Sequence, residues 1–385
     1  EKTLPHWIKY TKRRCLVMSG FDFITPFYNR RHNRESLING IDSILATESL
    51  PVRAIPFSCD KPPIEWFPKI KGGSRHALLM NENEGVQLFE LTHSFKDGEE
   101  EKKVSGRFFI YEHPRYEKVY VALAIESSSF FQKALYPFIK GLYPTVIMTF
   151  ITHKKLRNLL EEFQVINQFT ELIITRASQR LRFEEEGKHK KVMPVVSWPG
   201  MDLTEAFNWV YQNNGWFQSL QFEVRRNSAT IAEISFTRQG IVRTNHIFSK
   251  VFEAFVLPVC KAIHENIEIF GHRSRRENAD LSAKPLIIDF GEGQFSEVSE
   301  NAKFIHAMKR LKTASVSILH GNPYIHISVI DYHDGSTFDI WVLNENQLVI
   351  VPQMKGSIPA IKRLINHVFD TYAEGEINDY EEAMK

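Results

Sequence analysis

Three segments of this chain carry the same apolar stripe at helical spacing. Apolar side chains recur three or four residues apart, which places them on one face of an α-helix. The stripes are Phe131, Ala134, Leu135, Phe138 and Leu142; Phe252, Phe255, Val256, Val259 and Ile263; and Ile361, Leu364, Ile365, Val368 and Tyr372. Since each stripe follows an apolar strand-like segment, the sequence predicts a unit of antiparallel strands under one long helix, used about three times.

Prolines at matching places favour a true repeat. Pro137 and Pro258 each lie six residues after the leading phenylalanine of their stripe. Each is followed three residues later by a lysine, Lys140 or Lys261. The alternative is three ordinary amphipathic helices, whose shared spacing reflects helix geometry alone. The predicted fold class is α+β, with two or three units of mainly antiparallel β-sheet, each packed against a long amphipathic helix.

Composition shifts and turn residues divide the chain into five parts. The stretch GHRSRRENADLSAKP is polar, charged and without periodicity, so it is the predicted linker. We expect the units on either side of it to resemble each other and the first unit to be an elaborated version. The predicted parts are a basic N-terminal segment, 1–34; a first unit, 35–163; a second unit, 164–270; the linker, 271–285; and a third unit, 286–385.

Two hairpins are predicted from alternating apolar residues. In 220–236, a three-residue loop at 226–228 would place both apolar runs on one face. The opposite face would then carry Gln221, Glu223, Arg225, Glu233 and Ser235. In 326–342, the Asp334-Gly335 turn would put five apolar residues on one face and pair His326 with Leu343.

Charge and cysteine content limit the classes of partner and compartment. Lys plus Arg number 48 against 46 Asp plus Glu, so the net charge of +2 gives no whole-surface attraction to nucleic acid or anionic lipid. The three cysteines, Cys15, Cys59 and Cys260, are odd in number and far apart, which favours a reducing, cytoplasmic setting. The N-terminal sequence lacks the pattern of a secretory signal, so no export is predicted. Because lysines and prolines interrupt residues 130–151, we predict a buried helix there and no membrane partner.

The sequence contains no common catalytic motif. Phosphate-binding loops, nucleophile elbows and paired metal-ligand motifs are all missing, and no cofactor or metal is predicted. The third hairpin nevertheless gathers His320, His326, Asp331, His333, Asp334 and Asp339 within twenty residues. A metal-dependent hydrolase or nuclease of an unfamiliar class that uses 320–334 is therefore an alternative, although the odd spacing of His326 and Asp331 puts them on opposite faces of a strand. Catalytic residues stay unassigned, and whether the protein is an enzyme is open, with a non-catalytic role favoured.

Clusters of basic residues are the feature that most suggests a function. Arginines on loops can neutralise phosphates, and nearby aromatic rings can stack on unpaired bases. The predicted nucleic-acid contacts are Arg273, Arg275, Arg276, Arg30, Arg31, Arg13 and Arg14. The predicted function is a non-catalytic binding and assembly subunit that contacts DNA or RNA, or a nucleic-acid-handling protein complex, through these basic loops. A protein scaffold without affinity for nucleic acid is a further alternative, since edge strands and aromatic side chains also suit protein partners.

Overall fold

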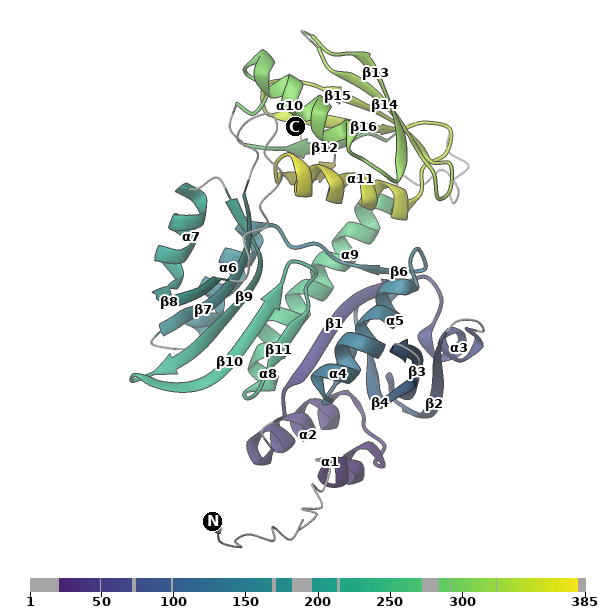
Figure 1. Cartoon of the computed structure of the whole chain (residues 1–385), viewed down its shortest axis with the longest axis vertical. Coiled ribbons are helices and arrows are strands. Elements are labelled where there is room, and N and C mark those ends of the chain that lie inside the picture. Colours follow the sequence, from purple (N-terminus) through teal and green to yellow (C-terminus); the bar gives the residue numbers. More distant parts are fainter. Residues whose placement is uncertain are drawn as a thin grey trace, which may run out of the picture.

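The protein has an α+β fold with two antiparallel sheets (Figure 1). The structure is a computed structural model that describes residues 21–48, 50–70, 74–97, 100–167, 171–181, 196–212, 215–271, 284–291, 293–322 and 324–379. Within these ranges one sheet has eleven strands and the other has six. The predicted fold class is confirmed.

The N-terminal unit comprises the elements from α1 to β6. They are α1 (Phe21–Tyr28), α2 (Arg34–Thr47), β1 (Val52–Cys59), α3 (Pro63–Trp66), the 3₁₀ turn η1 (Phe67–Lys69), β2 (Arg75–Asn83), β3 (Val86–Asp97), β4 (Glu100–Glu112), β5 (Val119–Ala124), α4 (Ser128–Phe130), the π-helical segment η2 (Phe131–Leu135), α5 (Tyr136–Gly141) and β6 (Val146–Met148). Its strands are ordered β2-β3-β4-β5-β1, and β6 also pairs with β1. Helices cover both faces, because α4 and α5 pack on one face and α1 and α2 on the other.

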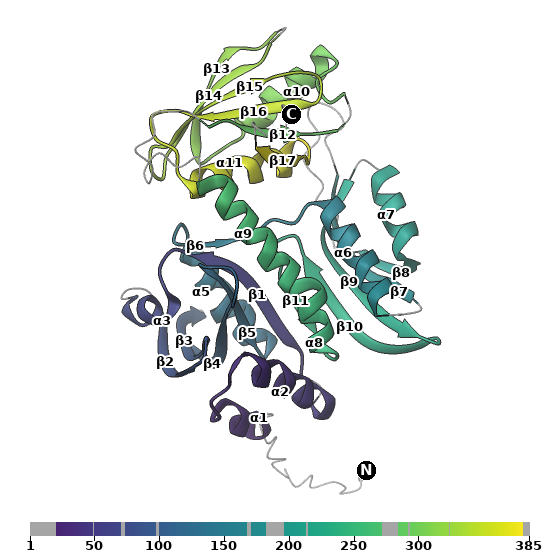
Figure 2. The same cartoon turned by 180° about the vertical axis from the view of Figure 1, so that it is seen from behind.

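The middle unit comprises the elements from α6 to α9. They are α6 (His153–Ile166), β7 (Glu171–Leu181), β8 (Val196–Asp202), α7 (Leu203–Gln212), β9 (Gly215–Arg226), β10 (Ala229–Thr237), β11 (Val242–Thr244), α8 (Phe248–Val251), the π-helical segment η3 (Phe252–Val256) and α9 (Leu257–Gly271). Strand β11 pairs with β1, so the N-terminal and middle units share the eleven-stranded sheet. Seen from behind, α9 crosses this junction (Figure 2).

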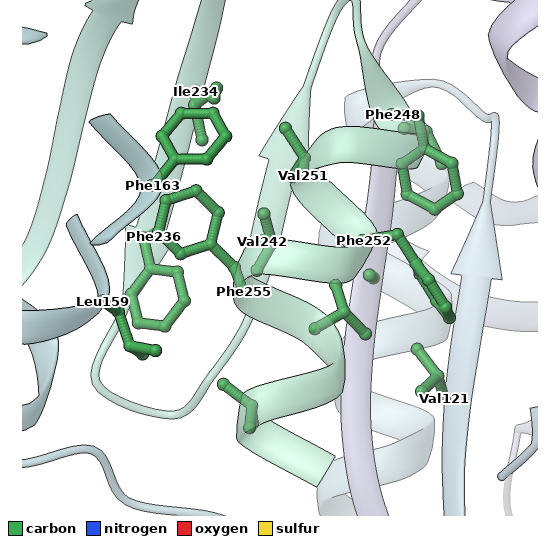
Figure 3. Packing of buried hydrophobic residues seen from close by; sticks show 14 of the residues in the cluster. Val121, Leu159, Phe163, Ile234, Phe236, Val242, Phe248, Val251, Phe252 and Phe255 are labelled. Carbon is green, nitrogen blue, oxygen red and sulfur yellow. The ribbon is translucent and has the colours of Figure 1, made fainter. Parts of the chain in front are cut away.

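A single core joins these two units (Figure 3). The π-helical segment η3 turns Phe252 toward the N-terminal unit, where its ring centroid lies 5.1 Å from that of Tyr111. Phe255 points the other way, with its ring centroid 4.7 Å from that of Phe163 on α6 and 5.6 Å from that of Phe236 on β10. All of these phenylalanines are buried, so this helix acts as a wedge between the two halves of the sheet.

The C-terminal unit comprises the elements from β12 to β17. They are β12 (Leu286–Asp289), α10 (Val298–Lys309), β13 (Ala314–His320), β14 (His326–Asp331), β15 (Thr337–Val342), β16 (Gln347–Pro352), α11 (Ile358–Thr371) and β17 (Glu376–Asp379). The strand order is β13-β14-β15-β16-β12-β17. Helices α10 and α11 pack on one face of this sheet, and α11 also contacts α9 (Figures 1 and 2).

The strand orders support the internal repeat. In both the N-terminal and C-terminal units a first strand and a helix, α3 or α10, lead into a four-strand meander, then a long helix and a last strand. In both sheets the first strand pairs with the last strand of the meander and with the strand after the helix. The sequence predicts that the middle and C-terminal units resemble each other most. The topology instead matches the N-terminal and C-terminal units most closely, because β8 and α7 interrupt the middle meander.

The two prolines give the first two stripe helices the same irregularity. Residue 136, before Pro137, donates its N–H to the carbonyl of Phe131, and residue 257, before Pro258, donates to Phe252. Both bonds span five residues, which widens the turn into a π-helix. A proline inside a helix lacks an N–H and clashes with the carbonyl four residues earlier, so one wide turn accommodates it. The stripe of α11 is buried without such a turn, since Pro359 lies in the first turn of that helix.

The predicted hairpins form with different turns. Between β9 and β10 the loop contains only Asn227 and Ser228, both with positive φ, as a primed turn requires. The extra residue is a bulge beside Ile231, which restores the common apolar face. The predicted three-residue loop is therefore wrong, although Val224 does face Ala232 across the strands.

In the C-terminal hairpin His326 pairs with Trp341, so the predicted pairing with Leu343 is wrong by two residues. The N–H of Asp331 bonds to the carbonyl of Ser336, and the loop between them has four residues, including Gly335 at φ +69°. A shift of two residues leaves every side chain on its predicted face. The inward apolar residues Ile327, Val329, Phe338 and Ile340 are accordingly buried.

Candidate binding surface

On the outer face of the C-terminal sheet, the part formed by β13 to β15 carries large exposed apolar residues, whereas Ile287 and Val349 at outward positions of β12 and β16 are buried. Side chains of the opposite face pack against α10 and α11, whereas the outer face has no described helix over it (Figure 1). We call its large exposed residues the outer-face patch: Leu319 (58% exposed), Ile330 (49%), Trp341 (42%) and Leu343 (45%). Large exposed apolar residues on neighbouring strands are typical of interaction sites.

His326 holds Trp341 in place. The two residues are register partners on β14 and β15, and their rings stack with centroids 3.6 Å apart and planes 16° from parallel. The Nε2 atom of His326 lies 3.7 Å from Oδ1 of Asp339, whose Oδ2 accepts a 2.9 Å hydrogen bond from Gln353. An aromatic side chain fixed before binding loses little freedom when a partner covers it, which is the property of an interface anchor.

The outer face carries little charge. At the outward positions of β13 to β16 the sequence provides serines, threonine, glutamines, histidine and apolar residues, with no lysine or arginine. Asp339 is the single acidic residue among them. Binding to a phosphate backbone depends on lysine and arginine. This face therefore suits a neutral or apolar surface.

The ligand set proposed for a metal in 320–334 is dispersed. Asp331 is buried and accepts two hydrogen bonds from the guanidinium of Arg363, at 2.8 and 2.6 Å. Asp334 accepts a hydrogen bond from the backbone N–H of Ser336 at 2.9 Å and one from the hydroxyl of Ser357. His320 and His333 are exposed. No three His, Cys, Asp or Glu side chains gather as a metal site within the described ranges.

Of the predicted nucleic-acid contacts, the structure describes only Arg30 and Arg31. Both are exposed in the short connection from α1 to α2. Arg13, Arg14, Arg273, Arg275 and Arg276 lie outside the described residues. The helix that precedes the predicted linker, α9, ends beside α11, whereas α1 lies at the opposite end of the long axis (Figure 1). Arg30 and Arg31 are thus far from the described residues that lead into the linker.

Two buried ionisable groups stand apart from the outer-face patch. Burial raises the pKa of Glu126 to about 7, although its carboxylate accepts a 2.9 Å hydrogen bond from the backbone N–H of Arg107. Burial lowers the pKa of Lys362, on α11, to about 7. The carboxyl group of Glu126 also interacts with the buried hydroxyl of Tyr28, whereas burial is the only influence on the pKa of Lys362.

The polar face of the β9–β10 hairpin is as predicted. Glu223 forms an ion pair with Arg225 at 2.8 Å, and Gln221 donates to Glu233 across the strands. Because these side chains pair with one another, this face is a hydrated surface rather than a site.

Comparisons with known proteins identify no family: neither protein-family models nor curated proteins match this sequence. Among the described residues, none of the helices is long and apolar enough to cross a membrane.

Sequence reasoning missed the outer-face patch, although a signal was present. Once the buried positions of the hairpin are assigned, Ile330 and Trp341 fall on the outward positions, where polar residues are usual. A tryptophan at an outward strand position indicates a binding surface. Predicting its stacking on His326 also requires the correct strand register.

Proposed function

We propose that this protein is a non-catalytic binding and assembly subunit that binds a protein partner through the outer-face patch. The observation that carries the proposal is the exposed Trp341, which stacks on His326 and has the exposed Leu343 two positions along on the same face. Aromatic anchors of this kind dominate the free energy of many protein interfaces. The absence of outward lysine and arginine on β13 to β16 favours a protein over a nucleic acid on this face. A cytoplasmic location belongs to the proposal, supported by the free thiols of Cys59 and Cys260.

Site-specific photocrosslinking in cells tests this proposal. A photoreactive residue at Leu343, two positions from Trp341 on the same face, should give a discrete protein adduct. Adding Trp341→Ser should reduce the adduct by about tenfold or more, because the anchor is lost. The matched control places the photoreactive residue at Tyr211, which is 72% exposed on α7. An equal adduct from both positions, or one that Trp341→Ser leaves unchanged, would refute binding at this face.

A second proposed contact is DNA or RNA at the basic clusters. Arg30 and Arg31 support it, because both side chains are exposed, and α1 and α2, which they connect, lie at the opposite end of the molecule from the C-terminal sheet. Phosphate contacts release counterions, so affinity should fall by orders of magnitude between about 50 and 200 mM salt. Neutralising Arg273, Arg275 and Arg276 should abolish much of this binding, and Arg30→Gln with Arg31→Gln should reduce it further. If labelled DNA and RNA fail to bind at low salt, the nucleic-acid contact is wrong and the protein-binding proposal is unaffected.

A further inference from the structure

The strand at one end of the C-terminal sheet carries no charged residue or proline to discourage pairing, and its bulge lies near its end, between Ile318 and His320. Natural edge strands carry charges or proline that discourage another strand from adding to them. Of the four strands that end the two sheets, β2 contains Arg75 and Glu82, β8 contains Pro199, and β17 contains Glu376 and Asp379. Strand β13, with the sequence ASVSILH, has none of these. Its other edge pairs with no strand in the described structure, and it lies at the margin of the molecule (Figure 1).

We propose that β13 is a homodimer interface, at which it pairs antiparallel with β13 of a second copy. The two six-stranded sheets then form one continuous sheet across a twofold axis. Such an interface is self-complementary by construction, because each residue of one copy meets the same set of residues in the other. The pairing extends the sheet sideways, so the outer-face patch stays accessible.

The register of this pairing follows from the existing hydrogen bonds. The N–H of Tyr332 bonds to the carbonyl of Thr313 at 2.9 Å, and antiparallel pairs alternate between bonded and non-bonded positions. The backbone groups of Ser315 and Ser317 therefore point toward β14. Those of Ala314, Val316 and Ile318 point to the free edge. A twofold axis at Val316 uses all three residues and gives up to about six backbone hydrogen bonds.

The side chains fit this register. Val316 meets Val316 of the second copy, and Ala314 meets Ile318, on the face that packs toward the core. On the exposed face Ser315 meets Ser317 of the second copy, so small neutral groups lie opposite each other. At β17 a second copy would bring its own Glu376 and Asp379 alongside those of the first, and neighbouring like charges are unfavourable. The absence of charge on β13 therefore favours a second copy as the occupant of this edge.

Two charge variants of the full chain test the proposal by sedimentation over a range of concentrations. The unmodified chain of 44.8 kDa should sediment with twice that mass at micromolar concentration. S315K/S317K places lysines opposite each other across the axis and should give a monomer. S315K/S317E carries the same number of new charges but places lysine opposite glutamate, so it should remain a dimer. Both serines are exposed, and circular dichroism verifies that each variant is folded.

Three sedimentation results would overturn the dimer proposal. A monomeric unmodified chain at every concentration overturns the proposal, and so does a dimer that persists in S315K/S317K. Monomers from both variants would show that the register is wrong and overturn it equally. Crosslinking from Leu343 reports on the outer-face patch independently, so failure there leaves this test intact.

Discussion

Replacing Lys362 with methionine should stabilise the protein at neutral pH by about 4 kcal/mol. The lysine is 6% exposed, and burial lowers its pKa from 10.5 to about 7. At about 1.4 kcal/mol for each tenfold change in proton affinity, that shift corresponds to about 4 to 5 kcal/mol. Methionine has a similar unbranched shape and needs no hydration, so it should fill the same space.

The pH dependence of this effect has a definite sign. Below pH 7 the lysine is protonated in both the folded and unfolded states, and the full cost of burying the charge is present. Between pH 7 and 10.5 the folded state binds fewer protons than the unfolded state, so the stability of the unmodified chain rises with pH. The advantage of Lys362→Met in chemical denaturation should therefore be largest near pH 6 and nearly vanish near pH 10. Lys309→Met, at an exposed position of α10, is the control and should change stability by less than about 0.5 kcal/mol. A destabilised Lys362→Met at every pH would contradict this account.

Removing the charge of Arg238 should lower the free energy of unfolding by about 3 to 5 kcal/mol and loosen the C-terminal unit. Its guanidinium is 3% exposed, pairs with Glu374 after α11, and lies 3.9 Å from the ring centroid of Phe150. Arg238→Met leaves the carboxylate of Glu374 without its guanidinium partner, and breaking a buried pair on one side is strongly destabilising. Hydrogen exchange should then show faster opening of α11. Removing both charges with Arg238→Met and Glu374→Gln should recover part of the loss.

The same junction provides a matched comparison. Lys154 pairs with Glu376 on β17, but both side chains are exposed, at 72% and 63%. Water screens the charges of an exposed pair, and holding two long side chains together costs entropy, so Lys154→Met should have little effect. If the two substitutions cost the same, burial would not be what makes Arg238 important.

Local patterns in the sequence predict the elements well, and turns less well. Alternation locates β9, β10, β14 and β15, and the apolar stripes locate the long helices, because each depends on neighbours in sequence. The turn between β14 and β15 is wrong because Asp334-Gly335 matches a two-residue turn, whereas Ser336 closes a longer loop onto Asp331. The even error preserved the faces, which is why the buried positions were correct.

Contacts between distant segments could not be predicted in the same way. Nothing in β1 or β11 indicates that they pair, and their three-residue register joins segments almost two hundred residues apart. The ion pair of Asp331 with Arg363 joins residues 32 positions apart, so no local sequence pattern predicts it. Of the predicted site, Arg30 and Arg31 are exposed as a binding role requires, while the outer-face patch emerged only from three-dimensional packing.

The wedge formed by Phe252 and Phe255 has an evolutionary consequence. If the three units descend from one ancestral module, the N-terminal and middle copies now depend on each other, because side chains from both form one shared core. The C-terminal copy retains its own sheet, its own helices and a separate core. Phe270 of α9 and the Arg238–Glu374 ion pair still tie this copy to the middle one, so selection can alter the C-terminal copy by itself wherever it keeps that junction, whereas the first two copies must change together.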